Sequence, residues 1–174
     1  VILLTCGIFD AGMPFLRISY YFTSATLVAL GLHAIYYFRT ALDIRYVIFL
    51  ALATLGADTF AYFVGRAIGK HKLNPRLSPK KTIEGSIGGI VCGGLLGLAY
   101  AYCVKIPYAL PHLALMSFVL ATTGQIGDLT FSSIKRTFEV KDYSQIFPGH
   151  GGVLDRFDSI IFNSMILGFL LTLL

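Results

Sequence analysis

The chain has 174 residues, of which 56% are hydrophobic and only 13% are charged. Its mean hydropathy is +0.74, and a soluble domain carries about 25% charged residues, so the composition excludes an ordinary soluble domain. The net charge of +5 does not indicate a nucleic-acid-binding protein, because no soluble basic domain is present to carry such a site. Phosphates of lipids or nucleotides are the simpler partners.

Apolar segments long enough, or nearly so, to cross a bilayer follow one another along the chain, since a spanning helix takes about 20 residues. They lie at residues 20–38, 46–64, 87–104, 109–126 and 159–174. The opening stretch, residues 1–16, is apolar but contains Asp10 and Pro14, and it is left unassigned. We therefore predict an all-α fold, a polytopic transmembrane helical bundle of about five spans.

Lys and Arg residues are shared unevenly between the two sides of such a bundle. Most of the 14 fall on one side, chiefly in two long polar segments at residues 65–82 and 127–158. Cytoplasmic loops carry the excess of Lys and Arg, so we expect both segments, and the active site, at the cytoplasmic face. We divide the chain into residues 1–45, N-terminal apolar spans that we expect to be truncated, and residues 46–174, a catalytic membrane domain.

The second polar segment contains carboxylates at positions that can converge. Asp155 and Asp158 are three residues apart, so they share a face if the segment after Gly152 is helical. Asp128 lies where the fourth span ends, and it meets the other two if the fourth and fifth spans pack together. Oxygen ligands without His or Cys suit Mg²⁺, which completes its shell with water and substrate phosphate. The pattern predicts a phosphoryl-transfer site with Mg²⁺, and a second cation is left open.

Glycines and cations surround these carboxylates. The run that contains His150, Gly151 and Gly152 lets backbone N–H groups approach a phosphate at a helix N-terminus, although most such runs are turns. A single loop His is more often neither a ligand nor a proton carrier. The cations that can neutralise phosphates, or alternatively contact anionic lipid headgroups, are Lys135, Arg136, Lys141 and Arg156.

Asp58 interrupts the second span. An ionisable residue at that depth costs about 3 kcal/mol or more, which favours a functional role. The alternative is a structural ion pair, because helical spacing places Asp58, Tyr62 and Arg66 along one stripe. Two hydroxyl and two ammonium groups then precede the third span, on Ser78, Lys80, Lys81 and Thr82.

The third span carries glycines at four-residue steps, namely Gly85, Gly89, Gly93 and Gly97. Such a stripe permits very close helix contact. It predicts a packing seam, either with a neighbouring span or with a second subunit, so a homodimer is left open.

These residues resemble the phosphatidate cytidylyltransferase family over residues 56–174. The match comprises Ser132-Ser133-Ile134-Lys135-Arg136, Lys141-Asp142, Ser144, Pro148, His150-Gly151-Gly152 and Asp155-Arg156-Phe157-Asp158. Upstream, Gly127-Asp128-Leu129, Asp58-Thr59, Gly65-Arg66, Ser78-Pro79-Lys80-Lys81-Thr82 and Glu84-Gly85 also fit.

The resemblance implies a multi-pass membrane enzyme that converts CTP and phosphatidic acid to CDP-diacylglycerol and pyrophosphate with Mg²⁺, among membrane lipids. A short chain leans towards the bacterial cytoplasmic membrane. By this likeness Asp128 and Asp155 bind the metal, and Asp158 is added from its helical proximity. The predicted catalytic residues are Asp128, Asp155, Lys135, Arg136, Lys141 and Asp142, and the predicted substrate-binding residues are Asp58, Ser78, Lys80, Lys81, Thr82, His150, Gly151, Gly152 and Arg156.

Two alternatives remain at this point. An ion-coupled transporter accommodates Asp58 within a span and the glycine-rich helices, but it leaves the acid-rich segment unexplained. A CTP-dependent lipid kinase can use a similar scaffold, and it would place the γ-phosphate on a lipid alcohol and release CDP.

Overall fold

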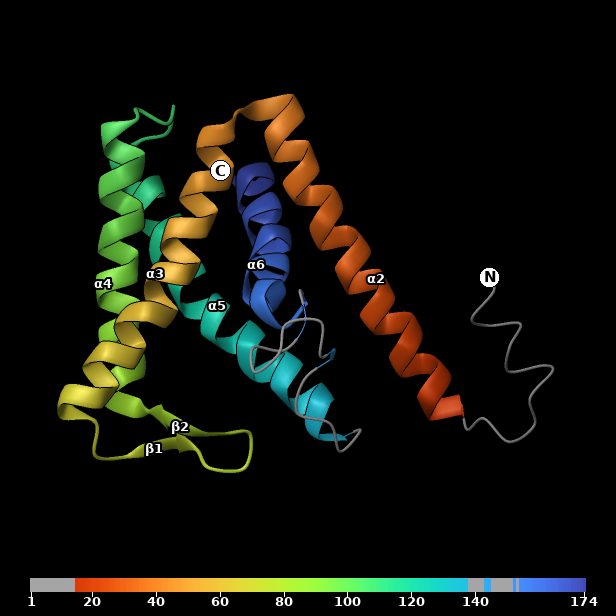
Figure 1. Cartoon of the computed structure of the whole chain (residues 1–174). Coiled ribbons are helices and arrows are strands. Elements are labelled where there is room, and N and C mark those ends of the chain that lie inside the picture. The colour runs from red at the N-terminus through yellow and green to blue at the C-terminus, as the bar shows by residue number, and fades with distance from the viewer. Residues whose placement is uncertain (1–14, 138–142, 145–151, 153) are drawn as a thin grey trace.

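The computed structural model describes residues 15–137, 143–144, 152 and 154–174, with the side chains of residues 15–17 and 156 outside the description. Long helices dominate this part of the chain (Figure 1). They are α2 (Phe15–Tyr37), which continues into the short π-helix η1 (Phe38–Leu42), then α3 (Ile44–Ile68), α4 (Ile83–Cys103), α5 (Leu110–Thr137) and α6 (Leu154–Leu173). The predicted all-α fold class is confirmed.

Three stretches are long and apolar enough to cross a membrane, namely Ile18–Leu42, Ile44–Ile68 and Ile83–Cys103. In α6 the apolar part, Phe157–Leu173, is shorter. The prediction of about five spans therefore corresponds to five long helices in the described chain, three of which have the length and hydropathy of a span.

The helix α5 continues well beyond residue 126, where its apolar sequence ends. Asp128 was expected at the exit of a span, and it lies instead inside a continuous helix. A single Gly127 costs a helix only about 1 kcal/mol relative to alanine, and no proline follows it before the helix ends. Lys135 and Arg136 occupy the last turn, where cations interact favourably with the helix dipole.

A short antiparallel hairpin, β1 (Lys72–Asn74) and β2 (Ser78–Thr82), connects α3 to α4. The sequence analysis did not include it, because its strands are too short and too polar to show an alternating pattern. Asn74 stabilises the turn, since its side-chain oxygen accepts hydrogen bonds from the backbone N–H groups of Arg76 and Leu77, both at 3.2 Å.

The glycine stripe of α4 packs against α3 of the same chain. A Cβ atom placed on Gly93 would lie 2.6 Å from Ala57 Cα and 2.8 Å from Ala57 Cβ, and one on Gly97 would lie 2.9 Å from Ala53 Cβ. Gly85 and Gly89 similarly face backbone oxygens of α3. Of the two partners considered for this seam, a neighbouring helix is the one that fills it.

Gly93→Ala should therefore lower the free energy of unfolding by about 1–3 kcal/mol, the usual cost of overpacking. Thermal unfolding of the detergent-solubilised protein measures this effect. Gly168→Ala is the matched control, because its added Cβ would meet only Phe38 Cζ, at 3.7 Å. The control should be neutral or slightly stabilising, since alanine is the better helix former. Equal midpoints for both variants would contradict the close contact.

A buried polar network holds α3, α5 and α6 together. Asn163 is fully buried, and its Nδ2 donates to Thr54 Oγ1 at 2.8 Å and to the Leu120 carbonyl at 2.7 Å. The Thr123 hydroxyl donates to Asn163 Oδ1 at 2.6 Å. Buried polar groups are costly unless they are paired, so this network fixes the packing that brings the polar ends of α5 and α6 together.

The described parts of the two polar segments lie at the same end of the bundle. Figure 1 shows the hairpin, the end of α3, the start of α4 and the end of α5 together at the bottom of the view. At the opposite end, Asp43 caps α3 by accepting from the Arg45 N–H at 2.8 Å, and the Arg45 guanidinium donates to the Val104 carbonyl at 3.0 Å. Helices that cross a membrane in alternating directions would place the two polar segments at one end of the bundle, as is found here.

Candidate active site

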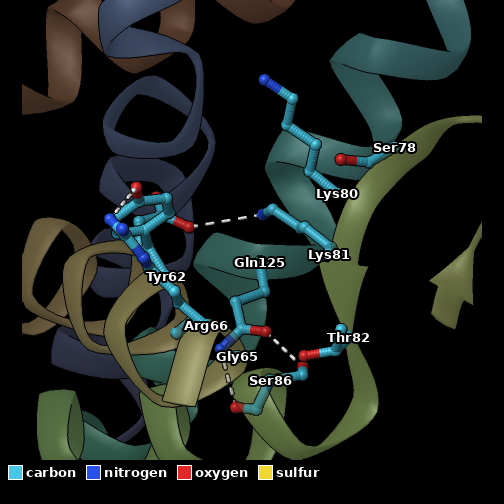
Figure 2. A pocket seen from close by; sticks show the side chains of 11 residues that line it. Tyr62, Gly65, Arg66, Ser78, Lys80, Lys81, Thr82, Ser86 and Gln125 are labelled. Carbon is cyan, nitrogen blue, oxygen red and sulfur yellow. Dashed lines mark hydrogen bonds and ion pairs between the residues drawn. The ribbon is translucent and has the colours of Figure 1, made fainter. Parts of the chain in front are cut away.

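A cavity of about 290 Å³ lies at the hairpin end of the bundle, between α3, β2 and α4, with one residue from α5 (Figure 2). Cationic and hydroxyl side chains form much of its wall, namely Arg66, Lys80, Lys81, Ser78, Thr82 and Ser86. Ammonium, guanidinium and hydroxyl groups donate hydrogen bonds to phosphate oxygens. The wall is therefore suited to a phosphate-bearing ligand.

Two residues fix the hairpin over the first turn of α4. Thr82 caps the helix by accepting from the Gly85 N–H at 3.2 Å. The Glu84 carboxylate accepts from the backbone N–H of Lys70 at 3.0 Å and of His71 at 3.2 Å, and it also pairs with His71 Nδ1 at 2.6 Å. Lys81, which directly precedes the Thr82 cap, is thus held near the positive end of the α4 dipole.

Lys81 bridges two carboxylates from different helices. Its Nζ atom lies 3.4 Å from Asp58 Oδ1 on α3 and 2.5 Å from Asp128 Oδ2 on α5. Burial alone lowers the pKa of Lys81, but the Asp128 and Asp58 carboxylates outweigh burial, and the pKa is raised above its usual value. The side chain therefore remains an ammonium at neutral pH.

Lys135 forms a second bridge. Its Nζ atom lies 2.9 Å from Asp155 Oδ1 and 3.9 Å from Asp158 Oδ2. Asp155 Oδ2 also accepts from the backbone N–H groups of Tyr143 and Gly152, both at 2.9 Å. Burial raises the pKa of the Asp155 carboxyl, but Lys135 and these amides outweigh burial and hold the pKa below its usual range. All the contacts of Asp155 stabilise its ionised form.

The two bridges adjoin each other. Asp128 lies near enough to both Asp58 and Asp158 for their charges to interact. The result is a row of four carboxylates bridged in pairs by two lysines, which we call the charge row: Asp58, Lys81, Asp128, Asp158, Lys135 and Asp155.

The three carboxylates predicted to bind metal lie in this row, but they do not converge on one point. Within the described residues, no group of three or more His, Cys, Asp or Glu side chains is arranged to hold a metal ion. Asp155 already accepts three donors. Asp158, by contrast, is 4% exposed, and its Oδ2 atom has no hydrogen-bond partner among the described residues. An orphaned buried oxygen beside the carboxylate of Asp128 fits a hard cation such as Mg²⁺, and Asp155 can join only if Lys135 moves.

The remaining predicted site residues fall into three groups. Asp58, Ser78, Lys80, Lys81 and Thr82 line the cavity. Arg136 is exposed on the last turn of α5, and Gly152 donates its N–H to Asp155 rather than remaining open to a phosphate. Lys141, Asp142, His150 and Gly151 lie outside the described residues, as does the side chain of Arg156.

Sequence reasoning missed two residues of the cavity, Ser86 and Gln125. The Ser86 hydroxyl donates to the Gln125 side-chain oxygen, and Gln125 Nε2 donates to the Ser86 carbonyl at 3.1 Å. Two features of the sequence could have indicated them: Gln125 places an amide within an apolar span, and Ser86 places a hydroxyl one turn beyond Thr82. The Arg66 guanidinium donates to the Tyr62 hydroxyl at 3.4 Å, so the ion-pair partner of Asp58 is Lys81 and not Arg66.

The sequence model of the cytidylyltransferase family matches residues 2–174. The chain belongs to the cytidylyltransferase family. The chain is 44% identical over 151 residues to a phosphatidate cytidylyltransferase of Staphylococcus epidermidis (strain RP62A), covering 86% of this chain and 58% of that relative. It is 43% identical over 130 residues to the phosphatidate cytidylyltransferase of Bacillus subtilis (strain 168), covering 75% of this chain and 48% of that protein. It is 41% identical over 151 residues to that of Staphylococcus aureus (strain COL), again covering 86% and 58%.

The chain thus spans 48% to 58% of the length of these relatives. The family match nevertheless includes the whole cavity and the whole charge row. The described residues contain three apolar helices of spanning length, which make the chain part of a membrane protein.

Proposed function

We propose that the full protein transfers the cytidylyl group of CTP to phosphatidic acid, giving CDP-diacylglycerol and pyrophosphate for phospholipid synthesis at the bacterial cytoplasmic membrane. The observation that carries the proposal is the junction of a cationic cavity with the charge row, made by Lys81 at one end of a helical bundle. Two phosphate-bearing substrates and a divalent cation need these two kinds of group side by side. The names of the relatives support the choice of substrates.

The reaction makes modest demands on acid–base chemistry. An oxygen of the lipid phosphate forms a bond to the α-phosphorus of CTP, while the bond from that phosphorus to the bridging oxygen breaks and pyrophosphate leaves. A phosphate monoester has a second pKa of about 6, so it is largely dianionic at neutral pH and requires no strong base. Catalysis then depends on positioning and on charge neutralisation.

The chain supplies groups for both positioning and charge neutralisation. Mg²⁺ held by Asp128 and Asp158, and by Asp155 if Lys135 moves, would supply positive charge to the phosphate oxygens. Arg66, Lys80 and Lys81 bind phosphate groups in the cavity, over the positive end of the α4 dipole. Lys135 orients the carboxylates of α6 from the facing helix, where its ammonium lies 5.2 Å above the centre of the Tyr143 ring.

The cavity borders the surface that faces lipid. Tyr62 lines it and is 60% exposed, and the neighbouring Phe63 is 59% exposed on the same apolar helix. A diacyl lipid can therefore lay its chains along α3 while its phosphate enters the cavity, and the nucleotide arrives from the aqueous side.

The decisive experiment uses the full-length protein in detergent–lipid micelles. Label from α-labelled CTP should enter organic-extractable lipid only when phosphatidic acid and Mg²⁺ are both present. Absence of incorporation by folded protein would contradict the proposal. A parallel reaction with γ-labelled CTP and a diacylglycerol acceptor identifies a lipid kinase, which transfers the γ-label instead.

A further inference from the structure

The side chain of Lys81 belongs to two sites at once. Its ammonium contacts Asp58 at 3.4 Å and also pairs with Asp128, while its stem lines the cavity beside Lys80 and Arg66. Figure 2 shows Lys81 reaching from β2 across the cavity, where its ammonium donates a hydrogen bond to Asp58. One residue therefore connects the carboxylates with the phosphate-binding wall.

The charges around Lys81 are not balanced. Asp58 and Asp128 share one ammonium and interact with each other. Asp158 adds a third carboxylate close to Asp128, with one buried oxygen that has no hydrogen-bond partner in the part of the chain that the structure describes. This excess of negative charge, together with an unsatisfied oxygen, favours a cation of higher charge than an ammonium.

A divalent cation would compete with Lys81 for the same carboxylate oxygens. The displaced Lys81 ammonium can move away from the carboxylates, because lysine carries a compact charge on a flexible four-carbon stem with rotatable donors. The adjoining cavity already presents Lys80 and Arg66. Adding the Lys81 ammonium to the cavity as a third cation is unfavourable while the cavity is empty, and it becomes favourable when a polyphosphate is bound there.

We propose that Lys81 is an exchangeable counter-ion of the charge row. Its ammonium neutralises Asp58 and Asp128 before ligands bind, and it moves to the nucleotide phosphates when the divalent cation takes its place. The nucleotide half of this proposal rests on the proposed function, whereas the exchange with metal rests on the ion pairs alone. Metal and nucleotide should then strengthen each other's binding by the same factor, since coupling between sites is reciprocal.

Mn²⁺, which carboxylates bind as they bind Mg²⁺, provides a direct probe. Electron paramagnetic resonance on the full-length protein measures its binding without any turnover. Lys81→Met should tighten Mn²⁺ binding about tenfold in the absence of CTP, within the usual range of site-to-site coupling. CTP should enhance Mn²⁺ affinity in the unmodified protein and lose most of that enhancement in the variant.

Lys80→Met is the matched control, because it removes the same charge from the neighbouring position of the same strand, where the side chain is exposed. It should change Mn²⁺ affinity in the absence of CTP by no more than about twofold, as expected for a screened surface charge. If Lys81→Met binds Mn²⁺ no more tightly than Lys80→Met, the exchange is wrong.

A second measurement needs no variant, so it stands even if Lys81→Met fails to fold. Amine acylation of the unmodified protein, measured residue by residue by mass spectrometry, reports how readily each lysine amine reacts. The reactivity of Lys81 should rise several-fold when Mn²⁺ is added alone and fall again with CTP, while Lys80 is unaffected by Mn²⁺. Equal protection of Lys81 with and without Mn²⁺ would overturn the proposal.

These outcomes are independent of the proposed reaction. A protein that shows Mn²⁺-dependent exposure of Lys81 but incorporates no label into lipid retains the counter-ion exchange and loses the cytidylyltransferase proposal. A protein that incorporates label but shows no exchange retains the reaction and loses only the role assigned to Lys81.

Discussion

Asp128→Asn should lower kcat for label transfer by about 1,000-fold or more. Asp128 pairs with Lys81 in the first bridge and lies close to Asp158 of the second bridge. An amide keeps its shape but loses the charge that attracts Mg²⁺. A bound metal contributes several kcal/mol to charge stabilisation in the transition state, and each 1.36 kcal/mol corresponds to a factor of ten in rate. The assay with α-labelled CTP measures the loss.

Asp43→Asn is the matched control for this variant. Like Asp128, Asp43 is a carboxylate paired with a basic side chain, here an arginine at 3.2 Å, but it caps α3 at the opposite end of the bundle. It should retain turnover. Asp128→Asn should unfold near the midpoint of the unmodified protein, because Lys81 keeps Asp58 as a partner. Turnover above a tenth of normal with unchanged Mg²⁺ dependence would remove Asp128 from the proposed metal site.

Lys135→Met should destabilise the protein by about 3–5 kcal/mol. Lys135 is 8% exposed and neutralises Asp155 and Asp158, which are also largely buried. Methionine fills a similar volume but leaves two carboxylates without their cation, and removing one member of a buried ion pair typically costs this much. Thermal or denaturant unfolding of the solubilised protein, followed by circular dichroism, measures the change.

Two companion variants separate charge from volume at this position. Lys135→Arg should recover much of the stability, since it keeps the charge. Adding Asp158→Asn to Lys135→Met should make the loss smaller than that of Lys135→Met alone, because one of the uncompensated charges is then absent. Lys72→Met, on the exposed face of β1, should be nearly neutral. An unchanged unfolding midpoint for Lys135→Met would show that the ion pairs contribute little to stability.

The helices could be predicted from the sequence because apolar length is a local property. Each of the five predicted segments lies within, or overlaps almost entirely with, one long helix. The end of α5 could not be predicted in this way, because hydropathy marks where apolar residues stop, and a helix continues until a residue breaks it. The hairpin depends on bonds made by Asn74 and Glu84, which no periodic pattern reveals.

The candidate site was predicted by residue type but not by pairing. Asp58, Lys81 and Asp128 were each named, yet the ion pairs that join them bring together α3, β2 and α5, which are far apart in sequence. The same limit applies to Asp155. Its spacing from Asp158 suggested two equivalent metal ligands, whereas, within the described residues, three donors surround Asp155 and one oxygen of Asp158 has none. Such differences arise from tertiary packing alone.

The glycine seam restricts how the cavity can open. Helices that touch backbone to backbone have no side chains between them to rearrange, so α3 and α4 must move as one rigid body. Asp58 and the start of α4 therefore keep a fixed separation. In the proposed reaction, entry of a lipid headgroup or departure of pyrophosphate then requires a hinge elsewhere, either in the hairpin that carries Lys80 and Lys81 or between this rigid pair and α5.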